Sequence, residues 1–229
     1  LEELKASYPE ENAHILNLES WQLFQKLNFG LSKNKEKDLR RLKYNLDRGL
    51  EIEPNSVDIL AARALIGLQY LGRSCGDSMA DIIKTEQLGS TVDTLTIAAG
   101  VYGNCGELKK GIESLRSALE LVPNDFGWFI TSNLVISLYL DDQIEEIYKL
   151  IGDDIEAKDM VGWVLAIYAF LEQEKGDMEK AKKYLERAKK QNLNLARFEE
   201  RLRNDDEELH KKTINGLKKI GDLGVKAFI

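Results

Sequence analysis

The chain has 229 residues, of which 43% are hydrophobic and 31% charged, so it is long enough to bury a sizeable core. Its formal net charge is -7, and acidic and basic residues are mixed along most of the chain. Because this pattern lacks the basic field that attracts phosphates, a nucleic acid is not an expected partner. The longest apolar runs, such as Gly162 to Leu171, are about ten residues, whereas a membrane-spanning helix needs roughly twenty, so no span is expected.

The first predicted elements are two pairs of helices. Straight-chain Leu, Lys and Glu are abundant and only three prolines occur, which favours helices throughout. After an N-terminal segment, residues 1–15, the first pair runs to Pro54, with the charged linker Lys33 to Asp38 between its helices. The second pair lies between Val57 and Gly89, and its second helix, around Ser78 to Leu88, is weakly patterned.

The third pair, between Val92 and Asp125, has the clearest pattern. Apolar residues recur at helical spacing from Val92 to Tyr102, and a cluster rich in glycine, residues 103–106, then breaks the pattern. A second apolar stripe follows at Ile112, Leu115, Ala118, Leu119 and Val122. Pro123 cannot continue a helix interior, so it marks the end of this pair.

Two further pairs and a different C-terminal segment complete the chain. The fourth pair, Phe126 to Gly152, has a short second helix, Ile144 to Ile151, and the fifth covers Gly162 to Leu193. Residues 195–229 are predicted to form a charged capping helix and tail, because a terminal repeat needs a solvated cover. Its apolar stripe is Phe198, Leu202, Leu209, Ile214, Leu217 and Ile220.

The pairs also resemble one another in sequence. The segment that begins at Gly106 aligns with the segment that begins at Gly176, and this alignment places Leu115 over Leu185. The offset corresponds to two repeats of about thirty-five residues, which is typical of stacked helical hairpins. One hairpin cannot bury its apolar face alone, so neighbouring hairpins are expected to stack.

The segment Val92 to Asp125 resembles a tetratricopeptide repeat. The residues that match the pattern of that repeat, in order, are Leu95, Ala98, Ala99, Tyr102, Gly106, Gly111, Leu115, Ala118 and Pro123. The resemblance implies an all-α fold, an α-solenoid of about five stacked antiparallel helical hairpins over residues 16–194. Such a solenoid winds as a right-handed superhelix, here closed by the C-terminal capping helix.

The order of features resembles the C-terminal repeat region of bacterial class III adenylate and guanylate cyclases and of related membrane-tethered winged-helix regulators. The resemblance rests on residues 17–24, the charged linker and the segment 50–55, followed by an acidic stretch and a Gly216 to Gly221 segment. It implies the non-catalytic regulatory or sensory region of a larger bacterial signalling protein. The first residue, Leu1 and not Met, agrees with that expectation.

The chain contains no recognisable catalytic set, so it is not expected to be an enzyme, and neither a metal nor a cofactor is predicted. Cys75 and Cys105 are the only cysteines. They can form a disulfide, contribute half of a metal site or serve as two buried small hydrophobic residues. The last interpretation is the favoured one.

The expected binding surface is the concave groove that the first helix of each hairpin lines in tetratricopeptide stacks. The resemblance places there Asp58, Leu65, Gln69, Asp93, Thr96, Asn104, Ile130, Leu134, Trp163, Phe170 and Gln173. Asn and Gln side chains would pair with the backbone of a peptide, and Trp163 and Phe170, seven residues apart, would receive an apolar side chain. The alternative is that these two aromatic residues only cover the capping helix.

The expected function is therefore that of a protein- or peptide-binding scaffold in signal transduction. The alternatives are a structural element that makes the parent protein a homodimer, a free-standing adaptor, and a small-molecule sensor with a pocket near Gly100 and Gly103. The expected location is the cytoplasm, or the periplasm if a membrane span precedes Leu1.

Overall fold

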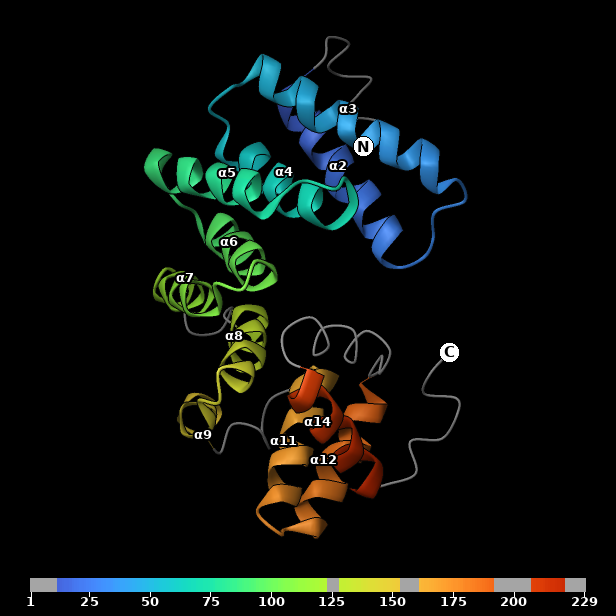
Figure 1. The fold of residues 1–229 in the computed structure, drawn as a ribbon, viewed down its shortest axis with the longest axis vertical. Helices are drawn as coiled ribbons and strands as arrows, with labels where there is room; N and C mark the ends of the chain where they lie inside the picture. The colour runs from blue at the N-terminus through green and yellow to red at the C-terminus, as the bar shows by residue number, and fades with distance from the viewer. Residues whose placement is uncertain (1–11, 123–127, 153–160, 192–206, 221–229) are drawn as a thin grey trace. The chain divides into compact units, whose positions relative to one another are not determined.

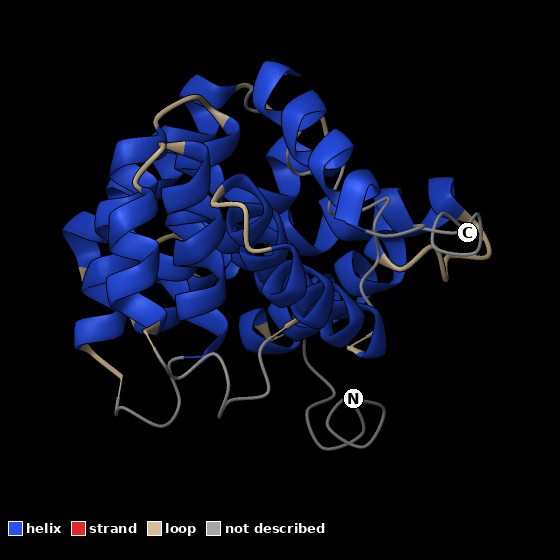
Figure 2. Ribbon diagram, turned by 90° about the horizontal axis from the view of Figure 1, so that it is seen from below, coloured by secondary structure: helices blue, strands red, loops and turns tan. Residues whose placement is uncertain are grey.

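The computed structural model describes residues 12–122, 128–152, 161–191 and 207–220, and within these ranges every regular element is a helix (Figures 1 and 2). The predicted all-α fold is therefore confirmed. None of the described helices combines the length and the apolar character that crossing a membrane requires. The helices are α2 (Ala13–Asn28), α3 (Lys35–Ile52), α4 (Val57–Tyr70), α5 (Cys75–Leu88), α6 (Val92–Asn104), α7 (Leu108–Glu120), α8 (Trp128–Leu140), α9 (Ile144–Ile151), α11 (Gly162–Glu174), α12 (Met178–Lys190) and α14 (Glu207–Ile220).

The chain divides into two compact units, which we call the N-terminal unit (residues 1–118) and the C-terminal unit (residues 119–229). In the N-terminal unit α2 packs on α3, α4 on α5, and α4 also on α6. In the C-terminal unit α8 packs on α9, and α11 packs on both α12 and α14. Helices that are consecutive in the chain thus pack in pairs, as expected of helical hairpins.

The turn inside each described pair contains one residue with a positive φ. These residues are Gly30, Gly72, Gly106, Asp142 and Gly176, with φ between 50° and 90° in round terms, the left-handed region that ends many helices. In four of the five turns the next residue donates its N–H to a carbonyl five residues earlier, as from Glu107 to Tyr102 (2.8 Å) and from Asp177 to Glu172 (2.9 Å). From residue 72 to 106, 106 to 142 and 142 to 176, the intervals are 34, 36 and 34 residues. The repeat seen in the sequence is therefore also a repeat of turn geometry.

Two helix starts differ from the sequence prediction. Residues 33–38 were expected to be a charged linker, yet α3 begins at Lys35. Asn34 caps this helix by accepting the Lys37 N–H, and Glu36 and Asp38 suit the positive end of its dipole. The second helix of the second pair also begins earlier than expected, at Cys75, because the Ser74 hydroxyl caps it by accepting the Asp77 N–H.

The cysteines also differ from the favoured interpretation. Cys75 and Cys105 are both partly exposed and form a disulfide, with their Cα atoms 5.6 Å apart. The prediction of two buried hydrophobic thiols is therefore wrong. The prediction failed because the pairing depends on the distance between the start of α5 and the end of α6, and the spacing of apolar residues does not report that distance.

A charge cluster around the buried carboxylate of Asp81 lies between α4 and α5 in the N-terminal unit. Arg63 donates two hydrogen bonds to the Asp81 carboxylate, at 2.8 and 2.7 Å, and Arg73 donates a third at 2.9 Å. The hydrogen bond from Arg63 to Asp81 raises the pKa of Arg63 above its usual value. Gly67 leaves the room that Arg73 needs, because a Cβ at this position would lie 2.3 Å from the Arg73 Cδ.

Aromatic rings fill the centre of the C-terminal unit. Tyr168 contacts Tyr148 and Tyr184 in edge-to-face arrangements, with ring centroids 5.5 and 6.1 Å apart, and its hydroxyl donates to the Ile147 carbonyl (3.0 Å). The capping helix α14 adds Ile214 and Leu217, both buried. The Phe198 and Leu202 positions of the predicted capping stripe lie outside the described residues.

Candidate partner-binding site

Six of the predicted groove residues lie in the N-terminal unit, on α4 and α6. Asp58, Gln69, Asp93 and Asn104 are exposed, and none of them is used in the core. The two helices meet at the predicted faces, since a Cβ at Gly100 would lie 3.4 Å from the Leu65 Cδ1. The structure thus brings this part of the set together on two adjacent first helices.

Two polar members of this surface are already hydrogen bonded within α6. The Asn104 side-chain amide donates to the Gly100 carbonyl (2.6 Å), and the Thr96 hydroxyl donates to the Val92 carbonyl (2.9 Å). The surface also lacks a large apolar side chain that is free of packing, because Leu65 is half-buried and packs against the core. As it stands it is a polar strip without an anchoring pocket.

The remaining five predicted residues lie in the C-terminal unit, where burial removes most of them from the surface. Ile130, Leu134 and Phe170 are buried, and Trp163 and Gln173 are half-buried. Phe170 lies directly beneath α14, because a Cβ at Gly216 would come within 2.4 Å of its ring. The position of Phe170 therefore agrees with the alternative interpretation, in which this residue covers the capping helix.

A different depression lies in the N-terminal unit, across α5, α6 and α7. It has a volume of about 700 Å³ and is shallow, closer to an open surface than to an enclosed cavity. We call it the α5–α7 groove. Its lining residues are Gly76, Met79, Ala80, Ile83, Glu86, Leu95, Tyr102, Glu107, Lys110, Glu113, Ser114 and Ser117.

The floor and wall of the α5–α7 groove are apolar. Met79, Ala80 and Ile83 come from α5, and Leu95 comes from α6. Ile83 is 48% exposed, although its neighbour Ile82 is fully buried in the core. The helix α5 therefore offers apolar side chains on two faces, one to the core and one to the groove.

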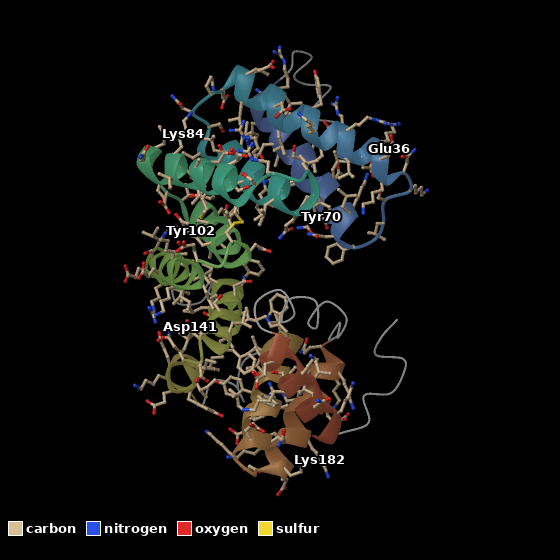
Figure 3. The ribbon with its side chains drawn as sticks, in the orientation of Figure 1. Glu36, Tyr70, Lys84, Tyr102, Asp141 and Lys182 are labelled. Atoms are coloured by element: carbon tan, nitrogen blue, oxygen red, sulfur yellow. A yellow bond between two sulfur atoms is a disulfide. The ribbon has the colours of Figure 1, made fainter. Side chains whose placement is uncertain are left out.

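Tyr102 forms the polar end of this floor; it is labelled in Figure 3. Its ring is buried, and its hydroxyl donates a hydrogen bond to the Glu86 carboxylate at 3.0 Å. Burial, and then the hydrogen bond to Glu86, raises the pKa of Tyr102 to about 12. The phenol consequently stays protonated at neutral pH, where it fixes the position of Glu86 and does not act as a base.

Carboxylates dominate the rim of the α5–α7 groove. Glu86, Glu107 and Glu113 line the groove together with one lysine, Lys110. The Lys110 ammonium lies 3.2 Å from the Glu107 carboxylate and 5.9 Å from the centre of the Tyr102 ring. Because Lys110 compensates Glu107, the carboxylates of Glu86 and Glu113 leave the rim negative. An apolar floor beside a negative rim suits a side chain with an apolar stem and a cationic head.

The sequence analysis missed this groove. It described the second helix of the second pair as weakly patterned. The structure supplies the reason, because Met79 and Ile83 line the groove while Ile82 packs in the core. The sequence feature that could have indicated the groove is helical spacing. Met79 and Ile83 are four residues apart, and Leu95 and Tyr102 are seven apart.

Comparison of the sequence with protein-family models gives no match, and comparison with curated proteins gives none either.

Proposed function

We propose that this chain is a non-catalytic scaffold of helical hairpins, of the tetratricopeptide kind, that binds a segment of a partner protein. The observation that supports this function best is the α5–α7 groove, where exposed Ile83 is part of an apolar floor that carboxylates border. The proposed binding surface therefore differs from the concave surface that the repeat pattern alone suggests.

The chemistry of the groove defines the partner as an extended segment that combines apolar and cationic residues. Burying one apolar side chain on the floor contributes roughly 1.5–3 kcal/mol. A pair between an exposed lysine and a rim carboxylate contributes about 0–1 kcal/mol. Affinity should therefore come mainly from the floor, whereas Glu86 and Glu113 should set the selectivity for basic segments and the rate of association.

Fluorescence anisotropy with a labelled short peptide of alternating Lys and Leu tests this proposal. We expect saturable binding, and we expect an otherwise identical peptide of alternating Glu and Leu to bind at least about tenfold more weakly. The substitution Ile83→Asn should weaken binding of the basic peptide by about tenfold or more, because it places a polar side chain on the floor.

The chain offers a matched control on the same helix. Leu88 lies in α5 and is 44% exposed, close to the 48% of Ile83, but it does not line the groove. Leu88→Asn should leave peptide affinity unchanged. Equal losses from Ile83→Asn and Leu88→Asn would mean that binding is non-specific and would contradict the proposal.

The polar strip on α4 and α6 is the competing surface, and the same titration distinguishes it. Gln69 and Asp93 are exposed there and line no part of the α5–α7 groove. If Gln69→Ala with Asp93→Ala weakens peptide binding while Ile83→Asn does not, the concave surface expected from the repeat is the binding site.

We further propose that the scaffold belongs to the regulatory end of a larger bacterial signalling protein, such as a nucleotide cyclase. The support is the resemblance in the order of sequence features, from residues 17–24 to the glycine-containing segment 216–221. Sequencing the gene upstream of the Leu1 codon tests it: a cyclase or winged-helix domain supports the proposal, and a start codon there leaves a free-standing adaptor. Sedimentation of the chain tests the alternative role in dimerisation, which a concentration-independent monomer excludes.

A further inference from the structure

The disulfide joins two neighbouring helical hairpins near the α5–α7 groove (yellow bond in Figure 3). Cys75 is the first residue of α5, and Cys105 is the C-cap of α6. Their chain separation is 30 residues, so the bond closes a loop that contains both helices. Gly76 and Tyr102, close to the two cysteines in sequence, line the groove.

Backbone hydrogen bonds also order the chain at both cysteine positions. The Ser74 cap fixes the start of α5 through a hydrogen bond from the Asp77 N–H at 3.0 Å. At the other position the Cys105 N–H donates to the carbonyls of Val101 and Tyr102, both at 3.1 Å. The packing of α5 on α6 thus presents the two cysteines at a Cα separation of 5.6 Å, inside the range that a disulfide spans without backbone movement.

We infer that the Cys75–Cys105 disulfide is a permanent cross-link of the working protein, and that this region of the chain acts in an oxidising compartment outside the cytosol. Disulfides persist in compartments such as the bacterial periplasm, whereas glutathione and thioredoxin systems keep cytosolic thiols reduced. Of the two expected locations, the disulfide therefore favours the periplasm. The inference does not depend on the proposed peptide binding.

Formation of the bond requires an oxidant, which we assign to the class of disulfide-donating proteins or small disulfides of that compartment. One cysteine thiolate attacks the donor disulfide and forms a mixed disulfide, releasing one donor thiolate. The second cysteine thiolate then displaces the other donor sulfur. The two cysteines lose two electrons and two protons in total, and the donor is reduced to two thiols.

Thiol trapping in cells that naturally produce the full protein tests the inference. Cells are quenched in acid, free thiols are alkylated under denaturing conditions, and the peptides containing Cys75 and Cys105 are examined by mass spectrometry. We expect neither cysteine to carry the alkylating label unless a reductant is added first. Alkylation of both cysteines without reductant would overturn the inference, whatever the purified protein does in air.

Thermal unfolding of the purified protein provides the second measurement. A reductant should lower the melting temperature of the N-terminal unit by roughly 10 °C, because opening the loop restores conformational freedom to the unfolded chain. The double variant Cys75→Ser with Cys105→Ser should melt at the lower temperature with or without reductant. An unchanged melting temperature on reduction would show that the bond is not a structural cross-link. Peptide binding enters neither measurement, so failure of the proposed function would leave both results intact.

Discussion

The two units close the same kind of helical hairpin with different chemistry. In the N-terminal unit α4, α5 and α6 are joined by the Asp81 charge cluster and by the disulfide. In the C-terminal unit tyrosine and phenylalanine rings pack edge to face between the helices, a contact that the N-terminal unit also makes between Phe24 of α2 and Tyr70 of α4. Both units share the turns with a positive-φ residue. Turn geometry is therefore the common feature of the hairpins, whereas the side chains that pack between hairpins differ.

Alkaline pH should produce the largest difference in stability between the two units. Burial raises the pKa of Tyr139, Tyr148 and Tyr168 in the C-terminal unit, and of Tyr102 in the N-terminal unit, above the usual value of 10.0. A raised pKa means that the folded state holds the proton more tightly than the unfolded state. Stability is therefore complete below pH 10 and falls as the pH rises above it.

The expected result is that the C-terminal unit unfolds at a lower pH than the N-terminal unit. Fluorescence of two variants, one keeping only Trp21 and the other only Trp163, reports on the two units separately. Tyr148→Phe should make the loss of stability with pH less steep in the C-terminal unit, because it removes one of the three groups. Unfolding of the N-terminal unit, reported by Trp21, at a lower pH than that of the C-terminal unit would contradict this prediction.

The substitution with the largest expected effect is Phe170→Ala. Phe170 is 2% exposed, contacts Tyr139 at a centroid distance of 6.1 Å and lies beneath α14, so its loss leaves a cavity under the capping helix. The free energy of unfolding of the C-terminal unit should fall by about 4 kcal/mol in urea titrations. Phe129→Ala, at a site that is 49% exposed, should cost less than about 1 kcal/mol.

In the N-terminal unit the corresponding test is Asp81→Asn. Asp81 is 6% exposed and accepts hydrogen bonds from Arg63 and Arg73, which would lose their counter-charge. We expect a loss of about 2 kcal/mol in the free energy of unfolding, measured by circular dichroism in urea. The control is Asp47→Asn in an exposed pair with Lys43, where a change above about 0.5 kcal/mol is not expected.

A pair of glycine substitutions tests how closely the helices of a hairpin approach. A Cβ at Gly111 of α7 would lie 3.0 Å from the Ala99 carbonyl oxygen, a backbone atom that cannot rotate away, so Gly111→Ala should destabilise by about 1–2 kcal/mol. Gly103 of α6 has no atom within 4 Å of its Cβ position. Gly103→Ala should therefore stabilise α6 by up to about 1 kcal/mol. Changes in melting temperature of the same sign for the two substitutions would contradict this prediction.

The smallest expected effect concerns the one turn, among the five described hairpin turns, whose positive-φ residue is not glycine. Asp142 has a φ of 56°, a conformation that costs an L-residue energy but costs glycine little. Asp142→Gly should stabilise the C-terminal unit by about 0.5 kcal/mol, and the reverse exchange, Gly176→Asp, should destabilise it by a similar amount. Differential scanning calorimetry of the two variants measures both shifts, and stabilisation by Gly176→Asp would contradict the role given to the turn.

Most of the fold could be predicted from the sequence because the apolar residues recur at helical spacing and glycines mark the turns. The short helix Ile144–Ile151 occurs where it was expected. The start of α3 was missed because a run of charges resembles a linker, although Asn34 supplies a cap. Helix ends depend on such single hydrogen bonds, which apolar spacing does not report.

Less of the candidate site could be predicted. Helix α8 is apolar on nearly all sides, so the sequence does not indicate that Ile130 and Leu134 face the core. Phe170 has the spacing of a groove residue, but its burial depends on where α14 packs. The α5–α7 groove draws its lining from three helices, and the sequence does not state which faces of those helices meet.

The position of α14 also has a consequence for synthesis of the chain. Within each described hairpin the closing backbone bond joins residues five or six apart, so a hairpin can close soon after it leaves the ribosome. The hydroxyls of Tyr139 and Thr213, by contrast, form a hydrogen bond across 74 positions of the chain. During translation Tyr139 and Phe170 are therefore made well before the helix that covers them, and a chaperone that shields apolar surfaces would meet the C-terminal unit in that interval.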